Sequence, residues 1–216
     1  MIPTTHDEWL KVRLAGIGAS EASAIIGLNP YMSNLELWKL KTGRKQAVDI
    51  SSNAHVRYGH EAEQHIRSLF ALDYANRYEV QYGGAFDMVH NQEYHWLFAT
   101  LDGRLIERET GRKGILEIKT CEVSSKIARE KWRDSIPDNY YVQILHQLLA
   151  TGFEFAVLHA QLKNVWGDEI KTTRQSYFIE RSEVEDDLKF LLEKEVDFWT
   201  KYVQKDIEPP VILPAI

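Results

Sequence analysis

The sequence predicts a mixed α/β fold (α+β mixed) in which helices flank a central mixed sheet. Two observations support it: apolar residues recur at helical spacing near both ends of the chain, and the middle alternates apolar and polar residues like strands. With 44% hydrophobic residues and six tryptophans, the 216-residue chain can bury a sizeable core. We expect one domain over 1–216, with an N-terminal helical part over about 1–75, a sheet with helices over about 76–205, and a short C-terminal tail.

Three helices are predicted in the N-terminal part. The first covers 20–26, where Ser20 can cap the first turn and Gly27 can end the helix. The second covers 35–41. The third covers 60–72, because its apolar residues share one helical face: Ala62, Ile66, Leu69 and Phe70.

The rest of the chain alternates strands with helices. Strands are predicted over 78–89, 96–106, 115–120, 155–162 and 175–179. A helix that stops at Gly152 has the apolar stripe Tyr141, Ile144, Leu145, Leu148 and Leu149. Ser182 with Glu185 forms the pattern of a capping box for a last helix, which Pro209 and Pro210 end. The residues expected to face inward on it are Leu188, Leu191, Leu192, Val196, Trp199 and Tyr202.

Composition excludes several classes of protein. No segment approaches the ~20 apolar residues that span a bilayer, so we expect no membrane partner. The first residues have neither the basic nor the apolar region of a secretory signal. Cys121 is the only cysteine, which rules out an intrachain disulfide and fits a reducing cytosol.

The charge pattern neither excludes nor requires a nucleic-acid partner. A net charge of −6 is mildly unfavourable for DNA, which usually selects a basic surface. Basic residues nevertheless outnumber acidic ones over 104–133, and acidic residues prevail after 180. This asymmetry is compatible with a DNA groove facing away from the tail, and equally with two ordinary solvated faces.

Asp102, Glu117 and Lys119 are the residues with the clearest chemical implication. Alternation along a strand places Glu117 and Lys119 on one side, whereas Ile118 points into a core. A turn at 109–114 folds the preceding strand back, which brings Asp102 next to Glu117. Two carboxylates and an ammonium on one sheet face suit a hard divalent cation and a phosphodiester. The alternative is a salt-bridged group on an exposed sheet face.

Arg13 and Ser20 form a second pattern. A glycine-bearing turn separates them and leads into a predicted helix start, where free backbone N–H groups can bind a phosphate. The Arg13 guanidinium can add a bidentate contact. The alternative is that Ser20 only caps the helix and Arg13 is a surface residue.

Two helical patterns are weaker. Glu63 lies one turn into a predicted helix beside Glu61, where acidic residues usually complement the helix dipole. Tyr140, Gln143 and Gln147 share the side of their helix opposite the apolar stripe, and such a polar face normally contacts solvent. Neither pattern indicates chemistry when taken alone.

Together these motifs resemble the phage lambda exonuclease family, also described as YqaJ-like viral recombinases, within the PD-(D/E)XK nuclease superfamily. The motifs occur in the family's order: Arg13 with Ser20, Gly59 followed by Glu63, Leu101-Asp102-Gly103, Leu116-Glu117-Ile118-Lys119, and Tyr140-Tyr141-Val142-Gln143 ahead of Thr151-Gly152. The resemblance extends from Arg13 to about Trp199. It implies a restriction-endonuclease-like core and a single nuclease domain.

The resemblance also implies an activity. Such an enzyme is a divalent-metal-dependent 5′→3′ exonuclease that degrades one strand of linear double-stranded DNA to mononucleotides. It leaves 3′ single-stranded tails for homologous recombination by strand annealing. The implied cofactor is Mg²⁺, as two ions, with Mn²⁺ as a possible substitute. The implied assembly is a homotrimer that works with a single-strand annealing protein, encoded by a phage or prophage and located in the bacterial cytoplasm.

Catalytic roles follow from the same resemblance. The implied metal ligands are oxygen donors: the carboxylates of Asp102, Glu117 and Glu63 and the carbonyl of Ile118. Lys119 would position or activate the attacking water, with help from Gln143. Glu61 competes with Glu63 as a ligand, although the four-residue spacing from Gly59 favours Glu63.

The resemblance assigns the 5′ phosphate to Arg13 and Ser20. Two departures from the family pattern concern neighbouring positions. The family's Ser-Pro before the aspartate is Thr100-Leu101 here, so the hydroxyl that can reach the phosphate is kept and the rigidity of proline is lost. A tryptophan that is common before the motif glycine is Tyr58 in this chain.

Two other functions stay open at this level. One is another PD-(D/E)XK enzyme that cuts within DNA as an endonuclease. The other is a non-catalytic scaffold that binds DNA ends during recombination. The joint presence of Asp102, Glu117, Lys119 and Gln143 favours catalysis.

Overall fold

The computed structural model describes residues 5–133, 135–166 and 169–213. Its main element is a five-stranded mixed sheet in the order β2-β5-β6-β7-β8, beside which lies a three-stranded sheet in the order β1-β4-β3. The larger sheet consists of β2 (Tyr78–Gln81), β5 (Gly103–Glu107), β6 (Lys113–Glu122), β7 (Phe155–Trp166) and β8 (Glu169–Glu180). The smaller sheet consists of β1 (Ile17–Gly18), β3 (Met88–His90) and β4 (Leu97–Thr100). Each sheet contains one parallel pair, β6 with β7 and β1 with β4.

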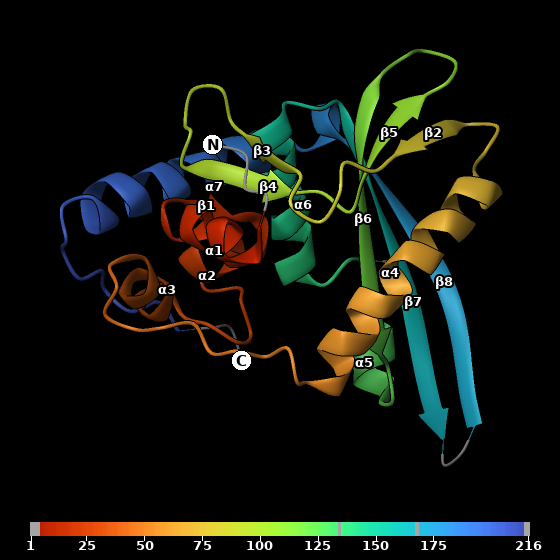
Figure 1. Ribbon diagram of the computed structural model, residues 1–216, viewed down its shortest axis with the longest axis horizontal. Coiled ribbons are helices and arrows are strands. Elements are labelled where there is room, and N and C mark those ends of the chain that lie inside the picture. The colour runs from red at the N-terminus through yellow and green to blue at the C-terminus, as the bar shows by residue number, and fades with distance from the viewer. Residues whose placement is uncertain (1–4, 134, 167–168, 214–216) are drawn as a thin grey trace.

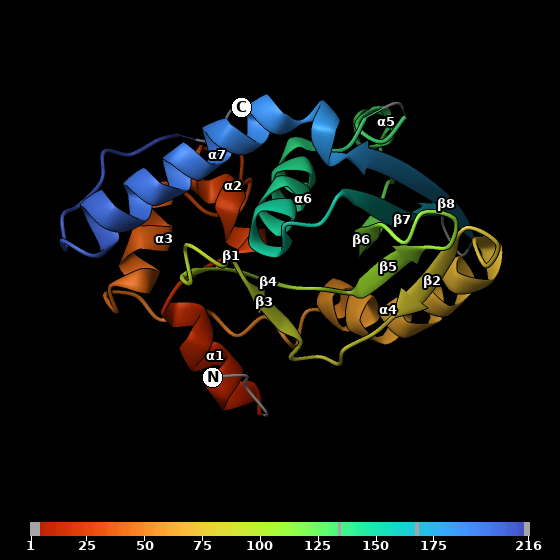
Figure 2. The ribbon, with the colours of Figure 1, turned by 90° about the horizontal axis from the view of Figure 1, so that it is seen from above.

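Helices cover both faces of the larger sheet, as the sequence predicts. The α-helices are α1 (His6–Leu14), α2 (Ala22–Ile25), α3 (Asn34–Lys41), α4 (Ala54–Asp73), α5 (Lys126–Glu130), α6 (Asp138–Thr151) and α7 (Glu185–Asp197). Short helical turns accompany them at η1 (Ala19–Glu21), η2 (Arg181–Glu183) and the π-helical η3 (Phe198–Val203). Figures 1 and 2 show α4 on one side of the larger sheet and α6 on the other. None of the helices in the described ranges is both long and apolar enough to cross a bilayer.

Alternation along β6 divides the core between the two faces. Leu116 and Ile118 pack with Ile66 and Phe70 of α4. Ile115, which points the other way, belongs to the cluster formed by α6, α7 and β7. Glu117 and Lys119 lie on the same side as Ile115, so the sheet presents them toward α6.

Two of the predicted strands are wrong as single elements. The strand over 78–89 is interrupted between β2 and β3, where Gly84 adopts a φ of +101° that a regular strand does not use. The strand over 96–106 divides at Leu101 and Asp102, because β4 pairs within the smaller sheet and β5 within the larger one. This division leaves Asp102 in the connection between the two sheets.

The predicted caps at Ser20 and Ser182 are also wrong. Ser20 lies inside η1, whose cap is Gly18, and the side chain of Glu21 accepts the Gly18 N–H at 2.8 Å. Ser182 lies inside η2, and α7 begins at Glu185 without a side-chain cap. In both places the serine lies within a 3₁₀ turn, so its hydroxyl is not at the start of the α-helix.

Helix boundaries differ from the prediction at three further places. The third predicted helix is longer, since α4 begins at Ala54 after Asn53 caps its first turn. The helices α1 and α5 were not expected from the pattern. The final helical segment ends at Val203, before the two prolines, because Asp206 adopts a left-handed φ of +56° and Ile207 N–H bonds to the Tyr202 carbonyl.

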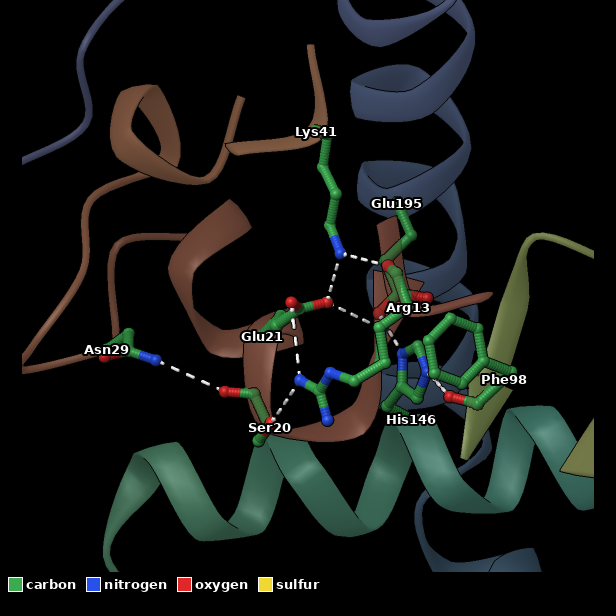
Figure 3. A network of polar contacts seen from close by, with 9 residues as sticks. Arg13, Ser20, Glu21, Asn29, Lys41, Phe98, His146 and Glu195 are labelled. Carbon is green, nitrogen blue, oxygen red and sulfur yellow. Dashed lines mark hydrogen bonds and ion pairs between the residues drawn. The ribbon is translucent and has the colours of Figure 1, made fainter. Parts of the chain in front are cut away.

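A buried ion pair joins α6, α7 and β4. His146 Nδ1 lies 2.6 Å from Glu195 Oε1, and its Nε2 donates to the carbonyl of Phe98 at 2.9 Å. Both side chains are fully buried. Figure 3 shows the imidazole between the glutamate and the strand. Burial by itself lowers the pKa of His146, but the charge of Glu195 and these hydrogen bonds raise it above its ordinary value.

The pair predicts a specific dependence of stability on pH. A folded-state pKa above the unfolded value of about 6.5 means that the contribution of His146 is complete below that value and is lost as pH rises through the folded pKa. We therefore expect the difference in unfolding free energy between the unmodified protein and His146→Gln to shrink as pH rises from 6 to 9. Urea unfolding across that range measures it, and a difference that grows with pH would contradict the expectation.

Candidate active site

Most of the predicted site residues line one cavity of about 1050 Å³ beside β6. The members of the predicted set that line it are Glu63, Thr100, Asp102, Glu117, Ile118, Lys119 and Gln143. They come from α4, the end of β4, the β4–β5 connection, β6 and α6. Arg13 and Ser20, although described, are not among its lining residues.

Glu117 is the most tightly held carboxylate of the cavity. Lys119 Nζ lies 2.6 Å from its Oε1, so the two side chains share one side of β6 as alternation predicts. Gln143 Nε2 donates to the same oxygen at 2.6 Å, and Gln147 Nε2 donates to Oε2 at 2.5 Å. Only 2% of Glu117 is exposed. Its orientation is therefore fixed by donors on both oxygens, a charged and a neutral one on Oε1 and a neutral one on Oε2.

The interpretation of Gln143 and Gln147 as a solvent face is wrong. Gln147 is fully buried, because α6 turns this side toward the polar face of β6. The sequence pattern places Gln147 on that face but assigns it no role at the site. The signal was available in the i, i+4 spacing from Gln143, which puts both amides within reach of one carboxylate.

Removing the Gln147 amide is expected to weaken the site. Gln147→Leu keeps the side-chain volume similar but withdraws a charge-assisted hydrogen bond from a buried carboxylate, an interaction that corresponds to about tenfold or more in rate. On a linear DNA duplex, the substrate that the sequence resemblance implies, we expect kcat to fall by that factor. The exposed Gln64→Leu on α4 is the matched control. Equal rates for the two variants would show that Gln147 does not contribute to the site.

Asp102 lies beside Glu117 through the register of the β5–β6 hairpin. Gly103 pairs with Leu116, so the residue before Gly103 is next to the residue after Leu116. The N–H of Ile118 donates to Asp102 Oδ2 at 2.8 Å. Burial raises the pKa of Asp102 well above its ordinary value, and the negative charges of Glu117 and Glu63 raise it further.

Two cationic side chains contact the acidic cluster formed by Asp102, Glu117 and Glu63. Burial alone lowers the pKa of Lys119, but the charges of Glu117 and Asp102 outweigh it and raise the pKa above the usual range. The Lys119 ammonium also lies over the Tyr140 ring, 5.0 Å from its centroid. Arg67 pairs with Glu63 at 2.9 Å and donates to the Asp102 carbonyl at 2.5 Å, which connects α4 to the acidic cluster.

The structure separates Glu63 from Glu61. Glu63 lines the same cavity as Asp102 and Glu117. Glu61 instead lines a smaller neighbouring cavity of about 320 Å³, together with Tyr58. Of the two glutamates, Glu63 is therefore the one in position to act with the acidic cluster.

The donor set fits a hard divalent cation by its chemistry. Mg²⁺ prefers oxygen ligands and keeps several waters, so two or three carboxylates and a backbone carbonyl suffice. Burial is the main cause of the raised pKa of Asp102, and the negative charges of Glu117 and Glu63 add to it; a divalent cation would relieve this repulsion. Among the described residues, no group of three or more His, Cys, Asp or Glu side chains is arranged to enclose a metal ion.

Arg13 and Ser20 lie together outside the cavity and are connected to its wall through Trp9. Arg13 Nη2 donates to Ser20 Oγ at 3.4 Å, and the guanidinium lies over the Trp9 ring at 4.7 Å from its centroid. Trp9 Nε1 in turn donates to Thr100 Oγ1 at 3.4 Å, and Thr100 lines the cavity. Trp9 is a connecting residue that the sequence motifs did not reveal.

Residues 8–154 match the YqaJ-like viral recombinase domain. The chain belongs to the YqaJ-like viral recombinase family. One curated relative is the uncharacterized protein YqaJ of Bacillus subtilis (strain 168), which is 32% identical over 209 residues. That match covers 92% of this chain and 57% of the relative, so the chain spans little more than half the length of that family member.

Solved structures agree with the fold expected for the family. An alkaline exonuclease from Laribacter hongkongensis (LHK-Exo) superposes with a TM-score of 0.57 at 20% identity, covering 93% of this chain and 97% of that one. A phage related exonuclease from Haemophilus somnus 129PT gives a TM-score of 0.53 at 12% identity, covering 88% and 96%. At these identities the likeness concerns the fold, and it confirms the restriction-endonuclease-like core predicted from the sequence.

Proposed function

We propose that the protein is a divalent-metal-dependent exonuclease that degrades one strand of linear duplex DNA from its 5′ end. The observation that carries this proposal is the placement of Asp102, Glu117 and Lys119 on the wall of one cavity, with Gln143 bonded to Glu117. Membership of a viral recombinase family supports it, as does the fold shared with two proteins described as exonucleases. The product would be mononucleotides and a 3′ single-stranded tail for recombination by strand annealing.

Oxygen donors in the cavity would hold the metal. Asp102, Glu117 and the carbonyl of Ile118 would bind one Mg²⁺, and Glu63 would contribute to a second, with Mn²⁺ as a possible substitute. When bound, such ions stabilise charge on the attacking and leaving oxygens of an in-line displacement. The hydrogen bonds from Gln143 and Gln147 to Glu117 keep that carboxylate in a fixed orientation.

Lys119 would act as a cation beside the attacked phosphate. Its ammonium lies at the cavity wall and donates to Glu117, and it need not lose a proton to contribute. A fixed positive charge orients the attacking water and stabilises the negative charge that develops on the phosphorus oxygens. Gln143, bonded to Glu117 on the same wall, would assist in holding the water.

The direction of digestion would follow from Arg13 and Ser20. A 5′ phosphate held there, with Thr100 reaching it from the cavity wall, sets a fixed distance to the cutting residues. The cut then falls at a constant position from the 5′ end, which releases mononucleotides. Arg13 and Ser20, the proposed phosphate seat, are connected to the cavity through Trp9 and Thr100, which supports a fixed spacing between the two.

Digestion of end-labelled DNA tests the proposal. Linear duplex with a 5′ phosphate should lose its 5′ label first in Mg²⁺, more slowly with a 5′ hydroxyl, and not at all in EDTA. A covalently closed circle should stay intact, whereas an endonuclease would cut it. Loss of the 3′ label first would refute the polarity, and protection of ends without nucleotide release would indicate a non-catalytic scaffold.

The family likeness also supports the assembly and setting proposed from the sequence. We propose a homotrimer around DNA that cooperates with a single-strand annealing protein, encoded by a phage or prophage and active in the bacterial cytoplasm. Light scattering after gel filtration should give about three times the chain mass of 25.1 kDa. A mass equal to one chain in the presence of DNA would exclude the ring.

A further inference from the structure

A buried lysine lies behind the Arg13–Ser20 pair. Lys41 is at the end of α3, and 1% of its side chain is exposed. Its ammonium lies 2.7 Å from Glu21 Oε2 and donates to the carbonyl of Arg13 at 2.7 Å. Figure 3 shows Lys41 and the Arg13 guanidinium reaching the same carboxylate, with Ser20 beyond the guanidinium. A lysine is rarely buried this completely unless its charge is paired.

Glu21 is shared unequally between the two cations. Its Oε2 accepts from Lys41 at 2.7 Å and from the Gly18 N–H at 2.8 Å. Its Oε1 lies 3.4 Å from Arg13 Nη2, which is beyond the usual length of a charge-assisted hydrogen bond. Burial alone raises the pKa of Glu21, but the charges of Lys41 and Arg13 hold it below its ordinary value. The carboxylate is thus ionised and mainly committed to Lys41.

Because Glu21 pairs mainly with Lys41, the N–H donors of the Arg13 guanidinium make only long contacts among the described residues, to Glu21 and Ser20. Arg13 is 24% exposed on its side chain, its contact with Ser20 is long at 3.4 Å, and it lies over the face of Trp9. Two cations face one carboxylate, so the group of Lys41, Glu21 and Arg13 carries a net positive charge. An oriented, partly exposed guanidinium with an uncompensated charge is suited to a phosphate monoester.

We propose that Lys41 is a positioning residue: by pairing with Glu21 it prevents a close ion pair between Glu21 and Arg13. The Arg13 guanidinium therefore stays available to a terminal 5′ phosphate. The inference rests on the proposed function, in which Arg13 holds that phosphate. Without Lys41, the strongest partner left for Glu21 is Arg13, and the two form a bidentate pair that fills the guanidinium's donors. Lys41 would then determine the preference for phosphorylated ends without touching DNA.

The test compares initial rates on 5′-phosphorylated and 5′-hydroxyl duplexes of the same sequence. In Lys41→Met we expect the ratio of the two rates to fall by about tenfold, the equivalent of one charge-assisted hydrogen bond, through a higher KM on the phosphorylated duplex. Lys45→Met is the matched control, because Lys45 also pairs with a glutamate, Glu36, but at the surface. That control should keep the original ratio.

A double variant separates positioning from a structural role. In Lys41→Met with Glu21→Gln, the neutral amide no longer captures Arg13, so we expect the ratio to recover at least in part. A ratio that falls further in the double variant would overturn the proposal, as would an unchanged ratio in Lys41→Met. Should Lys41→Met fail to fold by circular dichroism, Lys41→Gln, which keeps a hydrogen-bond donor without the charge, carries the same expectations.

The same assay separates this inference from the proposed function. An unmodified protein that digests both duplexes at one rate would show that Arg13 holds no terminal phosphate, which refutes the phosphate seat itself. An unmodified protein with a clear preference, together with Lys41 variants that retain it, refutes only the role of Lys41.

Discussion

Lys119→Met is expected to reduce Mg²⁺-dependent digestion of linear duplex DNA by at least about 10²–10³-fold, the range for losing one preorganised charge at a reacting centre. The substitution removes the ammonium 2.6 Å from Glu117 and keeps most of the side-chain length. Asp102→Asn should be equally damaging, because it removes a proposed metal ligand that Ile118 N–H holds in place. Release of acid-soluble nucleotides from 5′-phosphorylated duplex measures both effects.

The control for Lys119 lies on the same strand. Lys113 begins β6 and is exposed, so Lys113→Met should digest DNA at the unmodified rate. Thermal unfolding of each variant must show that the fold is retained. Digestion by Lys119→Met at the rate of Lys113→Met would mean that the cavity beside β6 is not where the phosphodiester is cut.

His146→Leu is expected to lower the free energy of unfolding by about 3–5 kcal/mol, the range for removing one partner of a buried ion pair. The reason is that Glu195 is fully buried and its Oε1 bonds to His146 at 2.6 Å, so the variant leaves a carboxylate without its cation in the core. Urea unfolding at pH 6 provides the measurement, because the raised pKa of His146 favours the imidazolium in the folded protein at that pH.

A second substitution identifies the source of that loss. In His146→Leu with Glu195→Leu the buried charge is removed as well, and stability should recover part of the deficit. His65→Ala, on the exposed side of α4, should change the unfolding free energy by no more than about 0.5 kcal/mol. A double variant less stable than His146→Leu would show that packing volume, and not the uncompensated carboxylate, sets the cost.

Local periodicity explains most of what was predicted correctly. The strand around Glu117 and the apolar stripe of α6 follow from spacings of two and 3.6 residues, which a short segment specifies by itself. Hairpin folding was also enough to bring Asp102 to Glu117, although the strand containing it divides between two sheets. The errors at Ser20 and Ser182 arose because a 3₁₀ turn and an α-helix start share the same sequence signals.

Long-range contacts explain what the sequence missed. Gln147 bonds to Glu117 across 30 positions, and Trp9 bonds to Thr100 across 91. The ion pair of His146 with Glu195 likewise spans 49 positions. No local pattern encodes which helix face meets which strand, so a polar helix face with no apolar neighbours was read as solvent-exposed.

The sequence by itself placed the residues proposed to cut DNA on one strand face and indicated the family to which the chain belongs, because alternation along β6 and motif order are properties of the linear chain. Only the tertiary structure decided which groups hold those residues in place: Gln147 behind Glu117, Arg67 beside Glu63, and Lys41 behind Arg13. The physical reason is that a buried polar group must find its partner wherever packing brings one, and packing is set by the whole fold.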